Sequence, residues 1–332
     1  MNCVIGVDLG GTNVRAELIF ASGERKNRVE IPSSAQEGTA ACVASVAEAI
    51  NQARKGAEPT RVGMAVPGHI QNNVVRWAPN FGEWREGKFH HWRDVKLGES
   101  IEAQTGLPVV MGNDANLAAL GEFRYGCGKN SANGLVLLTL GTGIGGGIIL
   151  SPRSVMGGLS RPTVLVGGNG GGAELGHIVI VKDGDPHPSA VAGTLEAYCN
   201  KDAIIRRALA RLTADSPDLL ARLCAGNPEN LTPKLLADAA ADGDRAALAV
   251  WEETGDYLGV GIGSIINTFA PEIVALGGQI AKAGALILNP AIESARRTAI
   301  PTLFSDTRIV LAEQVEDAGI LGAAALAFEE IE

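Results

Sequence analysis

The chain contains one short pattern twice: an apolar strand, a turn of glycine and threonine, and a second apolar strand. The first copy is VIGVDLGGTNVRAELIF at residues 4–20, and the second is LVLLTLGTGIGGGIIL at residues 135–150. Apolar runs of this length on both sides of a glycine turn are typical of β-hairpins. The copies stand about 130 residues apart, which is one domain length. We therefore expect two halves built on the same plan.

The segments around these hairpins alternate between strand and helix patterns. We expect strands at 3–9, 13–20 and 61–68, a strand leading into a helix at 109–126, helices at 39–54, 244–269 and 318–331, a loop-rich segment at 151–173, mostly helical chain from 196 to 268, and a strand, a Gly-Gly turn and a helix within 271–284. This alternation predicts an α/β fold with helices on the faces of the sheets. Because 332 residues exceed one ordinary core, we expect two domains with a cleft between them.

Charge and cysteine usage exclude several classes of partner. The net charge is −9, and no dense cluster of lysine and arginine occurs, so nucleic acid is not expected as a partner. The five cysteines form no CxxC pair, and no signal peptide precedes the first strand, so we expect reduced thiols in the cytoplasm. The uncharged segment 130–152 is rich in glycine, which predicts two short strands and no membrane partner.

The two glycine turns present backbone N–H groups that no Cβ obstructs, which suits phosphate oxygens. The residues of the turns are Gly10, Gly11 and Thr12 in the first copy, and Gly141, Thr142 and Gly143 in the second. An ordinary hairpin is the alternative for either turn alone, whereas two turns together favour a polyphosphate held from both sides. Gly141, Gly143 and Gly146 fit GxGxxG, but a strand follows them in place of a helix, which excludes the dinucleotide motif.

Two aspartates stand at the ends of apolar strands. Asp8 would be costly if buried without a partner, and either a magnesium ion accompanying a nucleotide or the N–H groups of the turn would offset that cost. Asn113 and Asp114 follow a strand and precede a helix. Asp114 is therefore either a helix N-cap or the general base of a phosphoryl transfer to an alcohol. The sequence leaves both interpretations open.

A third group of polar side chains stands among glycines later in the chain. Glu174 and His177 occur in AELGH, and Glu196 occurs in GTLEAY. Carboxylates and imidazole suit the hydroxyl groups of a sugar, and such a set rejects ligands that lack a hydroxyl. A structural role is the alternative for His177. His90 and His91 have no such setting, and we expect them at the surface.

In order and spacing, these motifs resemble the ROK family of sugar kinases and repressors, within the actin-like ATPase superfamily. The resemblance covers nearly the full chain. The stretches that carry it are DLGGT (8–12), GNDANLAALGE (112–122), LTLGTGIGGGIIL (138–150), AELGHI (173–178), LEAYCN (195–200), PEIVALGG (271–278) and GILGAAALA (319–327). It implies two actin-like, ribonuclease H-like domains with a ligand cleft between them. We expect a smaller domain of residues 1–116 plus 305–332, a larger domain of residues 117–304, and a homodimer.

The resemblance also implies a role for each motif. Asp114 would be the general base toward the 6-hydroxyl group of a sugar. ATP phosphates would lie between the two turns, with Asp8 toward Mg²⁺. The residues implied to bind the sugar are Asn80, Asn113, Asp114, Glu174, His177 and Glu196, and those implied beside the adenosine are Gly277 and Gly278. Glucose is the expected substrate, because Asn80 offers the amide found in glucokinase-like members.

The chain departs from the family in two respects. The family's zinc-binding cysteines fall on His187, Ser189 and Thr194, and Cys199 stands alone, so we expect no zinc site. Repressor members carry a DNA-binding segment ahead of the kinase module, and this chain starts within five residues of its first strand, so we expect no DNA reader. The alternatives to a glucose kinase are a ROK kinase for mannose, allose, fructose, N-acetylglucosamine or N-acetylmannosamine, and a noncatalytic sugar sensor.

Overall fold

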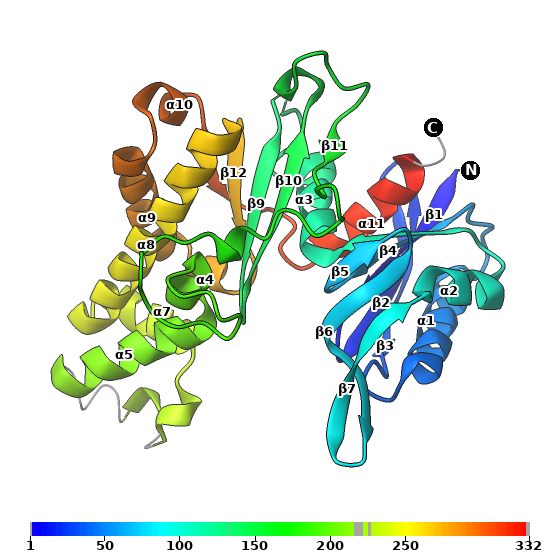
Figure 1. Ribbon diagram of the computed structural model, residues 1–332, viewed down its shortest axis with the longest axis horizontal. Helices are drawn as coiled ribbons and strands as arrows, with labels where there is room; N and C mark the ends of the chain where they lie inside the picture. Colours follow the sequence, from blue (N-terminus) through cyan, green and yellow to red (C-terminus); the bar gives the residue numbers. More distant parts are fainter. Residues whose placement is uncertain (1, 132, 216–221, 225–226, 330–332) are drawn as a thin grey trace.

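The computed structural model describes residues 2–131, 133–215, 222–224 and 227–329. It contains two five-stranded sheets whose strand orders are β3-β2-β1-β4-β8 and β11-β10-β9-β12-β13. In each order, neighbouring strands among the first three are antiparallel. The last two strands are parallel to the third. The two halves therefore share one topology, as the repeated hairpin predicted. Figure 1 shows the sheets on either side of two helices, α3 and α11.

The first sheet is formed by β1 (Cys3–Leu9), β2 (Asn13–Phe20), β3 (Arg25–Pro32), β4 (Val62–Val66) and β8 (Val109–Asn113). Strand β1 is buried on both faces, so it reads as a continuous apolar run. Its residues Ile5 and Val7 pack into the core that includes α1 (Thr39–Ala53). Val4 packs with Ile320 and Ala324 of α11 (Ala318–Glu329) on the opposite face. Alternation along one strand therefore fixes which helix covers each face.

The second sheet is formed by β9 (Leu135–Leu140), β10 (Ile144–Leu150), β11 (Thr163–Val164), β12 (Ile273–Gly277) and β13 (Arg308–Leu311). Val136 and Leu138 of β9 pack into the large core of this half. The helices of that half are α4 (Leu195–Cys199), α5 (Lys201–Asp215), α7 (Pro233–Ala241), α8 (Arg245–Phe269), α9 (Ala285–Thr298) and α10 (Pro301–Ser305). Leu135 and Leu137 face the opposite way, toward α3 (Asp114–Tyr125) and α11.

Helices α3 and α11 pack against each other between the two sheets. Helix α3 follows β8 of the first sheet but covers β9 and β10 of the second, whereas α11 follows β13 of the second sheet but covers β1 and β4 of the first. The fully buried Glu122 fastens α3 to the segment before α11. Its carboxylate accepts hydrogen bonds from the backbone N–H groups of Glu313 (3.1 Å) and Gln314.

A third sheet of three strands has no counterpart in the sequence analysis. It contains β5 (His69–Gln71), β6 (Val74–Arg85) and β7 (Lys88–Val95), and the β6–β7 hairpin projects from the molecule in Figure 1. Strand β6 buries residues at irregular intervals because its pairing with β7 shifts register between Trp77 and Gly82. That bulge removed the period of two that the prediction needed. His90 and His91 are exposed on β7, as predicted.

Two expectations need correction. The sequence analysis placed residues 305–332 in the smaller domain, but β13 pairs with β12 in the second sheet. We propose that the return to the first half begins with α11. The residues expected to form a helix within 271–284 form only a short 3-10 turn, Ile280–Ala283. The α-helix that follows, α9, begins beyond that range at Ala285.

The remaining helix predictions agree with the structure where it describes the chain. The helix expected at 244–269 is α8, and that at 39–54 is α1, whose last residue is Ala53. Residues 330–331 of the helix expected at 318–331 lie outside the described residues, as do 216–221 and 225–226 of the helical stretch 196–268. Among the described helices, none combines the length and the apolar character that crossing a membrane requires.

Candidate active site

A cleft of about 620 Å³ lies where strand ends of the two large sheets meet helix α3. Most of the residues singled out in the sequence line it. These are Asp8, Asn80, Asn113, Asp114, Gly141, Gly143, Glu174, His177, Glu196, Gly277 and Gly278. They come from seven separate segments of the chain, so the fold and not the sequence order brings them together.

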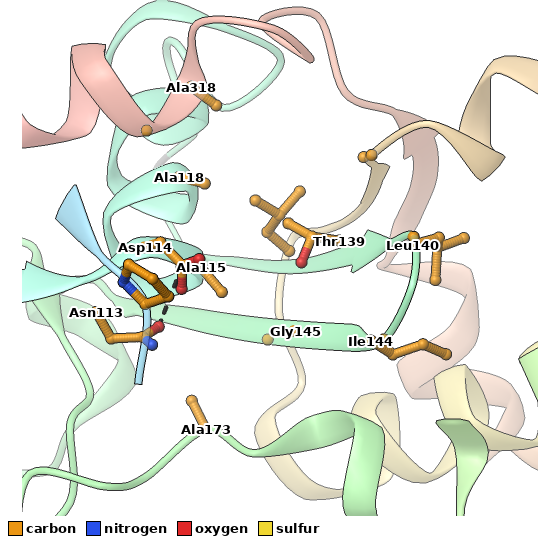
Figure 2. Close-up of a pocket in the computed structure, with 18 of the residues that line it drawn as sticks. Asn113, Asp114, Ala115, Ala118, Thr139, Leu140, Ile144, Gly145, Ala173 and Ala318 are labelled. Carbon is orange, nitrogen blue, oxygen red and sulfur yellow. Dashed lines mark hydrogen bonds between the residues drawn. The ribbon is translucent and has the colours of Figure 1, made fainter. Parts of the chain in front are cut away.

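Asn113 and Asp114 stand at the start of α3, beside the β9–β10 hairpin (Figure 2). Asn113 is the N-cap residue, because its Oδ1 accepts hydrogen bonds from the backbone N–H groups of Ala115 (3.0 Å) and Asn116 (3.1 Å). Its Nδ2 donates to the carbonyl oxygen of Gly68 (3.0 Å) and keeps a second proton for another acceptor. Asn113 is therefore the cap, and the Asp114 carboxyl group, which shares the N–H of Ala115 with it, lines the cleft.

The environment of Asp114 raises the pKa of its carboxyl group from 3.8 to about 6. Removal from water on the crowded floor of the cleft is the largest cause, and the negative charges of Asp8 and Glu174 add to it. A hydrogen bond from the backbone N–H of Ala115 to Oδ1 (2.9 Å) opposes the rise. A carboxyl group with this pKa is ionised at neutral pH and binds a proton more readily than an ordinary aspartate.

This raised pKa gives a stability prediction for Asp114→Asn. The folded state binds the proton more tightly than the unfolded state, so stability falls as pH rises from 3.8 through about 6. Near pH 8, the variant is expected to gain up to about 3 kcal/mol in the free energy of unfolding. Near pH 5, where the folded carboxyl is already protonated, about half of that gain should remain. Urea unfolding at both values measures the difference, and a gain independent of pH would contradict this account.

Asp8, at the end of β1, forms an ion pair with Arg15 of β2. The two residues are direct cross-strand neighbours in the hairpin, and both line the cleft. Arg15 also donates to the carbonyl oxygen of Glu316 (2.8 Å), which fixes the guanidinium group at the edge of the cleft. The sequence analysis did not single out Arg15, although pairing the two strands of the first hairpin would have placed it opposite Asp8.

In both glycine turns, the first N–H closes a hydrogen bond within the turn. The N–H of Gly10 donates to the carbonyl oxygen of Asn13 (2.9 Å), and that of Gly141 donates to Gly143 (2.9 Å). Gly10, Gly11, Thr12 and Thr142 are not among the residues that line the cleft, although Gly11 lies against the cleft residue Asn80. The second turn therefore lines the cleft, whereas the first turn packs against Asn80, which is itself a lining residue.

Several glycines of the β9–β10 hairpin have a packing role that the sequence analysis did not foresee. A Cβ on Gly145 would stand 2.8 Å from the Cβ of Ala115, and one on Gly147 would stand 2.7 Å from the carbonyl oxygen of Ala115. A Cβ on Gly143 would stand 2.7 Å from Oε2 of Glu196. These glycines allow α3 and the Glu196 carboxylate to approach the hairpin closely.

The three polar residues of the later segment differ in exposure. The side chain of Glu174 is 65% exposed, whereas that of Glu196 is 16% exposed. Glu196 lies at the start of α4, where its Oε2 accepts from the backbone N–H of Ile144 and its Oε1 lies 2.7 Å from Nε2 of His187. Nδ1 of His177 lies 3.7 Å from Oε2 of Glu174. Glu196 therefore joins the later segment to the second glycine turn.

The positions that carry cysteine in the related zinc pattern have other uses here. Thr194 is fully buried and accepts a hydrogen bond from the N–H of Ala197, so it caps α4. His187, Glu196 and His177 bring one potential metal-ligating atom each within 4.8 Å of one another among the described residues. The expectation that no zinc binds stays a prediction.

Comparisons with known proteins agree with this arrangement. The model of the ROK family matches residues 4–330. Glucokinase of Thermotoga maritima is 36% identical over 330 residues, which cover 99% of this chain and 98% of that protein. Glucokinase of Streptomyces coelicolor is 34% identical over 334 residues, with 99% and 98% covered.

A solved structure extends the agreement to three dimensions. The crystal structure of a ROK family glucokinase from Streptomyces griseus, in complex with glucose and AMPPNP, matches with a TM-score of 0.79 and 30% identity. The match covers 99% of this chain and 100% of that one. It confirms the predicted α/β class with two actin-like halves. From the family model, the relatives and the shared fold together, we conclude that the chain belongs to the ROK family.

Proposed function

We propose that this protein transfers the terminal phosphoryl group of ATP to the 6-hydroxyl group of an aldohexose, with glucose as the substrate. One observation carries the proposal. Asp114, whose carboxyl pKa is about 6, lines one cleft with the side chains proposed to bind the sugar and with a glycine turn suited to phosphate. Glucokinases are 34% and 36% identical to this chain over nearly its whole length.

The sugar would lie against the side chains that line the inner part of the cleft. Asn80 and Asn113 offer amide groups, and Nδ2 of Asn113 retains one proton that Gly68 does not use. Glu174 and Glu196 offer carboxylates that accept from hydroxyl groups, and His177 offers a ring nitrogen. Each oxygen of Glu196 already has one partner in the protein and keeps a further lone pair for a sugar hydroxyl group, which a ligand without that hydroxyl leaves unused.

ATP would lie on the other side of Asp114. Its phosphates would lie against the turn of Gly141 and Gly143, and its adenosine near Gly277 and Gly278, all of which line the cleft. Asp8 supplies a carboxylate at this end, which is the oxygen ligand that magnesium prefers. We propose that Asp8 holds the magnesium that accompanies ATP, directly or through water, and this ion would neutralise phosphate charge.

The transfer needs a group that accepts one proton. As the 6-oxygen forms its bond to the γ-phosphorus, the bond from that phosphorus to the β,γ-bridging oxygen breaks and ADP leaves. The proton of the 6-hydroxyl passes to the Asp114 carboxylate, which then returns it to solvent. Because the charges of Asp8 and Glu174 help to raise the pKa of Asp114, the same cleft that binds the substrates makes this carboxylate a better base.

A panel of hexoses tests the proposal. Release of ADP from ATP, measured by a coupled assay, is expected to depend on the added sugar and to be fastest with glucose. The same panel run with polyphosphate in place of ATP tests the phosphoryl donor. A clear preference for mannose, fructose or an N-acetylhexosamine would replace glucose as the substrate. Sugar binding without ADP release would refute the kinase and favour a sensor.

A further inference from the structure

The loop before α4 folds back over Glu196, and His187 lies at the contact. The side chain of His187 is 7% exposed, although it belongs to a loop. Its Nδ1 lies 2.7 Å from Oγ of Ser189 and accepts a hydrogen bond from the backbone N–H of Ser189 (3.2 Å). Its Nε2 lies 2.7 Å from Oε1 of Glu196. Ser189 therefore orients His187 through Nδ1, and Nε2 of the same ring contacts Glu196.

These partners fix which ring nitrogen carries the proton. A backbone N–H can donate but cannot accept, so Nδ1 of His187 is the acceptor toward Ser189. Nε2 then carries the proton and donates it to the Glu196 carboxylate, which only accepts. Since the other oxygen of Glu196 accepts from Ile144, both carboxylate oxygens have a fixed partner. The orientation of Glu196 is therefore set before any ligand arrives.

His187 also contacts the second predicted sugar-binding residue of this region. Its ring meets the ring of His177 edge to face, with the ring centroids 5.4 Å apart and the planes at 90°. Nδ1 of His177 is buried and has no hydrogen-bond partner among the described residues. Packing against His187 therefore helps to orient His177, beside the Glu174 carboxylate 3.7 Å from its Nδ1.

We propose that His187, oriented by Ser189, is a positioning residue that holds Glu196 and His177 for sugar binding. The proposal rests on the proposed function and adds to it the group that orients the sugar-binding side chains. His187 itself does not touch the sugar and acts through its contacts with the two residues. Removing its Nε2–H frees one oxygen of Glu196 to take other orientations, which weakens sugar binding while the ATP side keeps its own residues.

A pair of variants that differ by one methylene tests this role. In His187→Gln, the side-chain amide nitrogen reaches about as far as Nε2 of the histidine and can donate to Glu196. In His187→Asn, the amide falls short of the carboxylate. We expect the KM for glucose to rise about tenfold in His187→Asn and to stay within about threefold of the parent in His187→Gln. The KM for ATP should change less than that for glucose in both.

Two further measurements separate this proposal from its rivals. His90→Ala, which changes an exposed histidine of β7, controls for a general effect and should match the parent. Calorimetric binding of glucose without ATP tests His187 even if the parent shows no turnover, which would refute the proposed function alone. Equal loss of glucose binding in His187→Gln and His187→Asn would overturn the positioning role. So would one tightly bound transition metal per parent chain that is lost in His187→Asn, because His187 would then be a metal ligand.

Discussion

Replacing Asp114 with asparagine is expected to lower kcat by about 10²–10⁴-fold, the usual contribution of a general base. Asparagine keeps the shape of the side chain and its place at the start of α3, but it cannot accept the proton of the 6-hydroxyl. Because Asn113 and not Asp114 caps the helix, the variant should keep its fold. The KM for glucose should stay within about threefold of the parent, since the other residues proposed to bind the sugar are unchanged. Steady-state kinetics with ATP and glucose measure both quantities.

The pH profile and a matched variant serve as controls for this result. Below about pH 6 the parent's Asp114 binds a proton and ceases to be a base, so log kcat/KM should fall by about one per pH unit. This acid limb should be absent from the residual activity of Asp114→Asn. Asp306→Asn, which changes an exposed carboxylate after α10, should match the parent. Retention of more than about a tenth of kcat in Asp114→Asn would refute its role as the base.

Gly322→Ala is expected to lower the free energy of unfolding by about 3 kcal/mol or more, at the upper end of the range for overpacked cores. A Cβ at Gly322 of α11 would stand 1.6 Å from the carbonyl oxygen of Leu117 in α3. A backbone carbonyl cannot rotate away as a side chain can, so the two helices would have to separate. Chemical unfolding of the variant and the parent measures the loss.

Gly319→Ala is the matched control, since Gly319 lies in the same helix. Its added Cβ would meet the carboxyl carbon of Asp8 at 3.4 Å, which is an ordinary contact. Alanine also favours the helix over glycine by up to about 1 kcal/mol, so this variant should be as stable as the parent or slightly more so. If both variants lost the same stability, close contact between α3 and α11 would not be the cause.

The sequence predicted those features that depend on local pattern. The repeated hairpin at 4–20 and 135–150 predicted two halves, and the strand orders confirm that they share one topology. The strand before Asn113 and Asp114 predicted a polar pair at the end of a strand, and the structure places it in the cleft. The roles of these residues, the homodimer and the absence of zinc stay predictions.

The features that the sequence did not predict depend on contacts between distant segments. A bulge interrupts the alternation of buried and exposed residues in β6, so the sequence of this strand shows no period of two. Whether Asn113 or Asp114 caps α3 is decided by side-chain orientation, which the residue types alone do not fix. The contact between His187 and Glu196 depends on the folding of a loop whose residues show neither strand nor helix spacing.

The exchange of covering helices between the two sheets has a consequence for folding. The inner face of each sheet is covered by a helix that the chain supplies from the other half. Helix α3 covers the second sheet, and α11 covers the first. A half severed from its partner would expose an apolar sheet face, that of Val4 and Ile19 in one case and of Leu135 and Leu137 in the other. The two halves are therefore interdependent, and we expect the chain to unfold as one cooperative unit although its sequence shows two repeats of a single plan.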